Sequence, residues 1–256
     1  QQSSPLGAIV DHGIDAFCAF TTGIAVVNTI DPTLSSVRIM LGYCMFHLSW
    51  FSAQWGELEL GALDQRGITE GEFATMFALA IPGIIDLDFF SWRIYGSITF
   101  QLIMEIGVTV GCGAVSLAFF VKVMMATSGR RLEASLPFLH MCLHSAVAVL
   151  LAGTQFGQEN TMLNFLLVGM DAALLMTKVR LAATMHCNWP LVHLDTLPFI
   201  TVASLEIAGI HLGAAFFSAL LLFQLISFTL LWFDTVGRIC RGLDIPFLAP
   251  VPVKKA

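Results

Sequence analysis

The chain alternates long apolar stretches with short breaks that carry proline, glycine or charge. A helix that crosses a bilayer needs about 20 mostly apolar residues. Eight stretches approach that length, and a weak break at 211–213 divides the last two: 6–28, 34–54, 69–85, 97–125, 134–153, 160–182, 196–212 and 213–235. The pattern predicts an all-α, polytopic transmembrane helical bundle of about eight spans.

Composition supports lipid as the solvent of this chain. Of its 256 residues, 57% are hydrophobic and only 12% are charged, whereas a soluble domain is about a quarter charged. We therefore expect one transmembrane domain over 1–245 and an exposed C-terminal tail over 246–256. The formal net charge of −6 gives no reason to expect a nucleic-acid partner.

The basic residues are unevenly distributed between the two sides of the predicted bundle. With eight spans, the side on which the chain starts carries ten basic residues and the other side carries Arg38 and Arg93. The ten are Arg66, Lys122, Arg130, Arg131, Lys178, Arg180, Arg238, Arg241, Lys254 and Lys255. Because cytosolic loops are enriched in lysine and arginine, the first helix is predicted to begin at the cytosol.

That first helix carries the candidate chemistry. Residues four apart share a helix face, so Gly7, Asp11 and Asp15 form one stripe, with His12 beside it. Two carboxylates in an apolar segment repel each other and are costly to bury, and no basic residue precedes Arg38. Hard oxygen ligands at this spacing suit Mg²⁺ or Mn²⁺. A hydrated first turn, where acidic groups are favoured by the helix dipole, explains the spacing equally well.

The same residues resemble a known motif. Gly7, Asp11 and Asp15 match the closing half, G-x-x-x-D-x-x-x-D, of the motif of the CDP-alcohol phosphatidyltransferase family. The strings at 3–7 and 11–15 are similar to the S-S-P-L-G and D-H-G-x-D of its choline/ethanolamine phosphotransferase branch.

A weaker resemblance continues further along the chain. Residues 54–61 are similar to the tryptophan-glutamate segment of that branch, although the usual W-E-E-Y-H is not kept, and 67–71 match its later G-x-x-E-G. The motif's opening half, D-x-x-D-G-x-x-A-R, is not in this sequence. The resemblance therefore implies an N-terminally incomplete chain that is inactive alone.

The resemblance implies an enzyme that transfers phosphocholine or phosphoethanolamine from its CDP ester to diacylglycerol and releases CMP. It implies two Mg²⁺ or Mn²⁺ ions in the complete site, a homodimer, and a place in the endoplasmic reticulum or Golgi membrane with the site facing the cytosol. The implied roles are metal ligands for Asp11 and Asp15, general base for His12 or Asp15, and substrate binding for Gly7, Glu57 and Glu70.

Several residues outside the motif are compatible with more than one role. Glu105, Asp171 and Glu206 lie inside apolar stretches, where ionisable groups are expensive and often functional. They fit hydrogen-bonded helix contacts, whereas Asp11, Asp171 and Glu206 together would form the ion path of a secondary transporter. A glycine seam on the fourth stretch (Gly107, Gly111 and Gly113) is typical of close helix packing and would support a dimer.

Overall fold

The computed structural model describes the backbone of residues 5–31, 37–61, 68–86, 88–185, 189 and 193–243. The side chains of 5–13, 68–74, 184–185 and 243 lie outside that description, as does the predicted tail 246–256. Within these ranges the chain is almost entirely helical, as the apolar pattern predicts.

Each of the eight predicted stretches coincides with a helix. These are α1 (Pro5–Ile30), α2 (Val37–Leu60), α3 (Ile68–Ile84), α4 (Phe100–Ala126), α5 (Arg131–Ala152), α7 (Thr161–Met185), α8 (Leu197–Ile207) and α9 (Gly213–Leu243). The short elements are a 3₁₀ turn (Phe89–Ser91), the antiparallel hairpin of β1 (Arg93–Tyr95) and β2 (Ile98–Thr99), and α6 (Gln155–Glu159).

The predicted count of about eight spans is not supported. Among the described residues, four helices are long and apolar enough to cross a membrane, namely α4, α5, α7 and α9. The helix α8 has 11 residues, about 16 Å at 1.5 Å per residue, which is short of a hydrocarbon core of about 30 Å. The described apolar parts of α1 and α3 are also short. The structure therefore supports an all-α membrane protein with four clear candidate spans.

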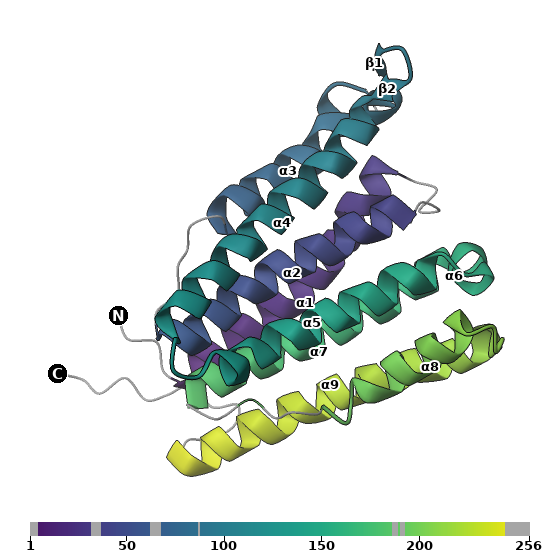
Figure 1. Ribbon diagram of the computed structural model, residues 1–256. Coiled ribbons are helices and arrows are strands. Elements are labelled where there is room, and N and C mark those ends of the chain that lie inside the picture. Colours follow the sequence, from purple (N-terminus) through teal and green to yellow (C-terminus); the bar gives the residue numbers. More distant parts are fainter. Residues whose placement is uncertain are drawn as a thin grey trace, which may run out of the picture.

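The helices alternate in direction, so that their ends gather at two ends of the bundle (Figure 1). The helices α1 and α5 begin, and α2, α4, α7 and α9 end, on the side of both chain termini (Figure 1). We call this the basic end, after Arg130, Lys178 and Arg180. At the other end, the predicted break at 211–213 is a turn between α8 and α9, in which Gly209 and Gly213 have positive φ angles of 87° and 76°. Glycine adopts this conformation without steric penalty.

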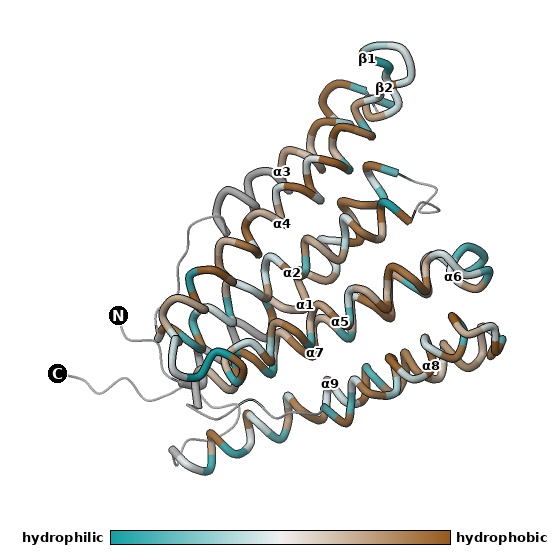
Figure 2. The backbone as a smooth tube through the Cα atoms, viewed as in Figure 1, coloured by the Kyte–Doolittle hydropathy of each residue, from teal (hydrophilic) through white to brown (hydrophobic). Residues whose placement is uncertain are grey.

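Helix α7 is the centre of the bundle. In its most apolar window 78% of the residues are buried, against 17% in α4 and α9. The outer helices α4 and α9 are rich in apolar residues (brown in Figure 2), and several of these are exposed, among them Val110 and Leu230, as expected of lipid-facing helices. A β-carbon added at Gly169 of α7 would lie 2.1 Å from the Tyr43 hydroxyl and 2.2 Å from the Phe20 ring. Gly169 thus lets α1 and α2 approach the backbone of α7.

Candidate functional site

The motif residues lie at the start of α1, in continuous helix at the basic end (Figure 1). The backbone therefore places positions 7, 11 and 15 on one helix face, as predicted. Asp15 is half-buried. The side chains of Gly7, Asp11 and His12 lie outside the described residues, as does that of Glu70 in the first turn of α3. The helical stripe is in place, and its ligand geometry remains a prediction.

Lys178, near the end of α7, lies at about the same height along the bundle as the stripe of Gly7, Asp11 and Asp15. The helices α1 and α7 run in opposite directions (Figure 1) and are in register where Phe20 faces Gly169. Asp11 is nine residues before Phe20, and Lys178 is nine residues after Gly169, so each lies about 14 Å from that contact at 1.5 Å per residue. Lys178 therefore lies near the level of Asp11.

Glu57, a predicted substrate-binding residue, is held in an ion pair. Its carboxylate accepts a hydrogen bond from the guanidinium of Arg180 on α7. Two residues earlier, the fully buried Trp55 donates from Nε1 to the Ala134 carbonyl at 2.8 Å, which fixes α2 against α5. One turn of α2 thus anchors the helix through Trp55 and presents a carboxylate at the basic end through Glu57.

A second polar group is built around Lys178, two residues before Arg180 on α7, and the sequence did not indicate it. The Lys178 ammonium donates to the Asp195 carboxylate and lies 3.3 Å from Nδ1 of His193. Trp189 donates from Nε1 to Nδ1 of His140 at 2.9 Å. We call Lys178, Asp195, Trp189, His193 and His140 the Lys178 cluster.

His193 is uncharged in this cluster at neutral pH. Burial chiefly, and then the positive charge of Lys178, lower its pKa from 6.5 to about 4, although nearby Asp195 acts in the opposite direction. Its Nε2 is buried without a hydrogen-bond partner, and His193 is only 7% exposed. A neutral imidazole presents an aromatic face to this site and adds no charge.

Among the described residues, no group of three or more His, Cys, Asp or Glu side chains is arranged to hold a metal ion. The side chain of Asp15 belongs to these described residues, and that of Asp11 does not. The expected donors still fit a hard divalent cation in type and spacing, because α1 carries both carboxylates one turn apart. The Mg²⁺ or Mn²⁺ site remains a prediction.

Glu105, Asp171 and Glu206, which lie inside apolar stretches, all have partners. Glu105 on α4 pairs with Arg38 at 3.2 Å, and Glu206 accepts from the Leu212 amide at 3.1 Å and contacts His211, which closes the turn before α9. These two carboxylates are explained by local structure.

Asp171 lies in a different environment. It is fully buried on α7, 3.3 Å from Nε2 of His144 on α5, and accepts a hydrogen bond from Gln224 on α9 at 3.0 Å. His47 on α2 is also fully buried, and neither of its ring nitrogens has a partner. Polar groups from α5, α7 and α9 therefore meet inside the bundle. His144 and Asp171 are far apart in the sequence, so the sequence alone could not predict this contact.

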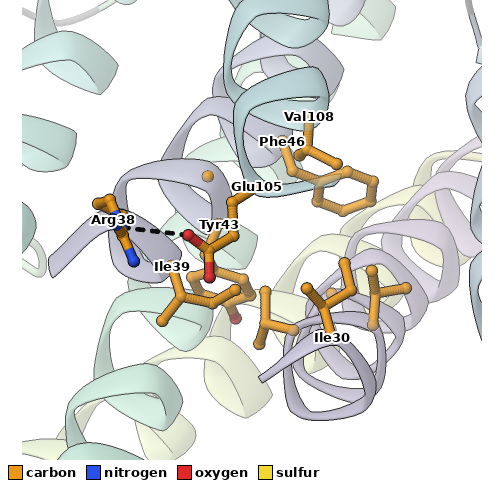
Figure 3. A pocket seen from close by; sticks show the side chains of 11 residues that line it. Ile30, Arg38, Ile39, Tyr43, Phe46, Glu105 and Val108 are labelled. Carbon is orange, nitrogen blue, oxygen red and sulfur yellow. Dashed lines mark ion pairs between the residues drawn. The ribbon is translucent and has the colours of Figure 1, made fainter. Parts of the chain in front are cut away.

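A small apolar pocket lies between α1, α2 and α4 (Figure 3). Its walls include Val26 and Ile30 of α1, Phe46 of α2 and Val108 of α4. The Arg38–Glu105 ion pair lies at its edge (Figure 3). This lining suits a hydrocarbon chain, since it offers apolar area with charge confined to one side.

Comparison with known proteins adds no assignment. No model of a known protein family matches this chain, and no curated protein matches it significantly.

Proposed function

We propose that this protein transfers phosphocholine or phosphoethanolamine from its CDP ester to the free hydroxyl of diacylglycerol and releases CMP. The reaction takes place at the basic end of the bundle, on the cytosolic face of an endoplasmic reticulum or Golgi membrane. The observation that carries the proposal is the continuous helix through positions 7, 11 and 15, with the motif spacing and with cations of α7 near the same level.

The chemistry requires charge neutralisation and loss of a proton. The lipid hydroxyl oxygen forms a bond to the phosphorus that bears the alcohol, the bond from that phosphorus to the CMP oxygen breaks, and CMP leaves with its electron pair. The hydroxyl proton passes to His12 or Asp15. Divalent ions held by Asp11 and Asp15 would neutralise the phosphates and the charge that develops on CMP.

Between these two candidates, His12 is the better general base. An imidazole has an unperturbed pKa near 6.5, close to the value that a general base needs at neutral pH. A carboxylate that binds a divalent cation is less basic. We therefore assign proton abstraction to His12, substrate approach to the backbone at Gly7, and orientation of the nucleotide to Glu57 and Glu70.

The apolar pocket is consistent with a diacylglycerol acceptor. It begins along α1 at Gly23, eight residues beyond Asp15, or about 12 Å at 1.5 Å per residue. An acyl chain in one leaflet extends about 15 Å, half of the hydrocarbon core. A lipid whose hydroxyl lies near Asp15 would therefore reach the pocket with the end of its chain.

The test is release of CMP by the protein expressed from its natural reading frame and reconstituted in lipid nanodiscs. We expect CMP and phospholipid in equal amounts from CDP-choline or CDP-ethanolamine with diacylglycerol, and no turnover after chelation of divalent ions. Absence of turnover from both CDP esters in the presence of Mg²⁺ and Mn²⁺ would contradict the proposal.

Secondary transport is a second candidate, because Asp171 is a fully buried ionisable group of a membrane helix, and such groups often mark ion paths. Asp171→Asn separates the two functions. A phosphotransferase should keep its CMP release, since asparagine can still hydrogen-bond to Gln224 and His144. A proton-coupled transporter should lose substrate-driven proton uptake into vesicles.

A further inference from the structure

An exposed apolar hairpin lies at the end of the bundle opposite the basic end. Figure 1 shows β1 and β2 beyond the start of α4, away from both chain termini. Four large side chains of this segment are between 40% and 80% exposed, namely Trp92, Ile94, Tyr95 and Ile98. We call these four residues the hairpin surface. Apolar and aromatic side chains gathered on so short a segment mark a contact with another molecule or with the membrane.

The hairpin is held firmly on α4. The Phe100 amide at the start of α4 donates to the Trp92 carbonyl at 3.2 Å. The Thr99 hydroxyl caps the helix by accepting from the Leu102 amide at 3.2 Å, and the rings of Phe89 and Phe100 are stacked with centroids 4.4 Å apart. The level of α4 in the membrane therefore sets the level of the hairpin.

The length of α4 places its start among the lipid headgroups. Its 27 residues extend about 40 Å at 1.5 Å per residue, which exceeds the hydrocarbon core of about 30 Å by about 10 Å. Glu105 and Lys122 lie at nearly equal distances from the two ends of α4, so the hydrocarbon core is centred on its middle. Phe100 then lies about 5 Å outside the core, in the headgroup layer. Ile103 and Ile106, one turn further along, are exposed to the lipid.

The hairpin surface has the chemistry that suits this boundary. Trp92 and Tyr95 each combine an apolar ring with a polar group, and such rings are enriched where the hydrocarbon meets the headgroups. Ile94 and Ile98 add apolar area. The exposed Arg93 of β1 can reach a lipid phosphate with its guanidinium while its methylene groups stay in apolar surroundings.

We infer that the hairpin surface inserts into the headgroup layer of the leaflet opposite the basic end and binds phospholipid there. The inference rests on α4 as a membrane span and is independent of the proposed phosphotransferase activity. Lipid is favoured over a soluble protein because the fixed hairpin begins at the depth of the headgroups. The exposed Asp86 and Asp88 lie just before the hairpin, so a zwitterionic phospholipid fits better than an anionic one.

The experiment measures the depth of Trp92 by fluorescence quenching in phosphatidylcholine nanodiscs. The emission of Trp92 is the difference between the natural full-length protein and its Trp92→Phe variant. Phosphatidylcholine brominated close to the headgroup should quench most of this emission, and phosphatidylcholine brominated near the end of the acyl chain should quench much less. Trp55→Phe is the matched control, because Trp55 is fully buried and neither lipid should quench its emission.

Two results would overturn the inference. Quenching of Trp92 by iodide in the water, without quenching by either brominated lipid, would place the hairpin in solvent. Protection of Trp92 from iodide and from both lipids would mean that protein covers it. If Trp92→Phe does not fold, Tyr95→Trp adds an emission at the tip of the hairpin, which should show the same preference for the bromine near the headgroup. Equal quenching of the added emission by both lipids, or none, would again contradict the inference.

Discussion

Replacing Asp11 by alanine is expected to abolish CMP release. Asp11 occupies the centre of the motif stripe on α1, and loss of a carboxylate ligand removes charge stabilisation that is needed only in the transition state. Loss of a single stabilising group of this kind reduces kcat by at least about a hundredfold. The measurement is the initial rate of CMP release at saturating Mg²⁺ in the full-length protein.

Two controls keep the Asp11 result specific. Asp88→Asn changes an exposed carboxylate near the opposite end of the bundle and should leave the rate unchanged. Asp11→Asn keeps the shape of the side chain and should also be inactive, with an unchanged melting temperature. If Asp11→Ala turns over at the wild-type rate, the metal assignment and the role of the stripe are wrong.

The sequence predicted the helices better than it predicted their relation to the membrane. All eight apolar stretches fold as helices, including the separate α8 and α9, because the glycines at 209 and 213 mark a real turn. The predicted count of about eight spans is not supported, because an apolar stretch can also belong to a helix that is buried inside the bundle and does not cross the membrane. Helix α8 is apolar and has only 11 residues, so hydrophobicity alone could not show that it is too short to cross.

Some features of the candidate site depend on local helix geometry, which the sequence predicts, and others depend on tertiary packing, which it does not. The stripe of Asp11 and Asp15 depends only on helical periodicity, so the sequence could indicate it. The Lys178 cluster joins α5 and α7 to the segment that leads to α8, and its residues share no regular spacing in the sequence. Likewise, the sequence shows His144 and Asp171 only as separate polar residues of two helices. The packing of α5 against α7 brings them to 3.3 Å from each other.

Gly169→Ala should strongly destabilise the protein, because the new methyl group would overlap Tyr43 and Phe20. Both rings are buried, at 1% and 6% exposure, so they cannot swing into open space. Overpacking of this kind costs about 1–3 kcal/mol. It would also push α1, which carries the motif stripe, away from α7, so CMP release should fall together with the melting temperature.

The matched control for Gly169→Ala is Gly83→Ala on α3, outside the glycine seam of α4. A β-carbon at Gly83 meets no atom within 4 Å, and alanine is favoured over glycine in a helix by up to about 1 kcal/mol. That variant should therefore melt at the same temperature as the unmodified protein or higher. Equal melting temperatures for the two variants would mean that α1 and α2 do not pack as closely on α7 as described. The motif stripe and Lys178 would then not share one level of the bundle, because that level is set by the contact of Phe20 with Gly169.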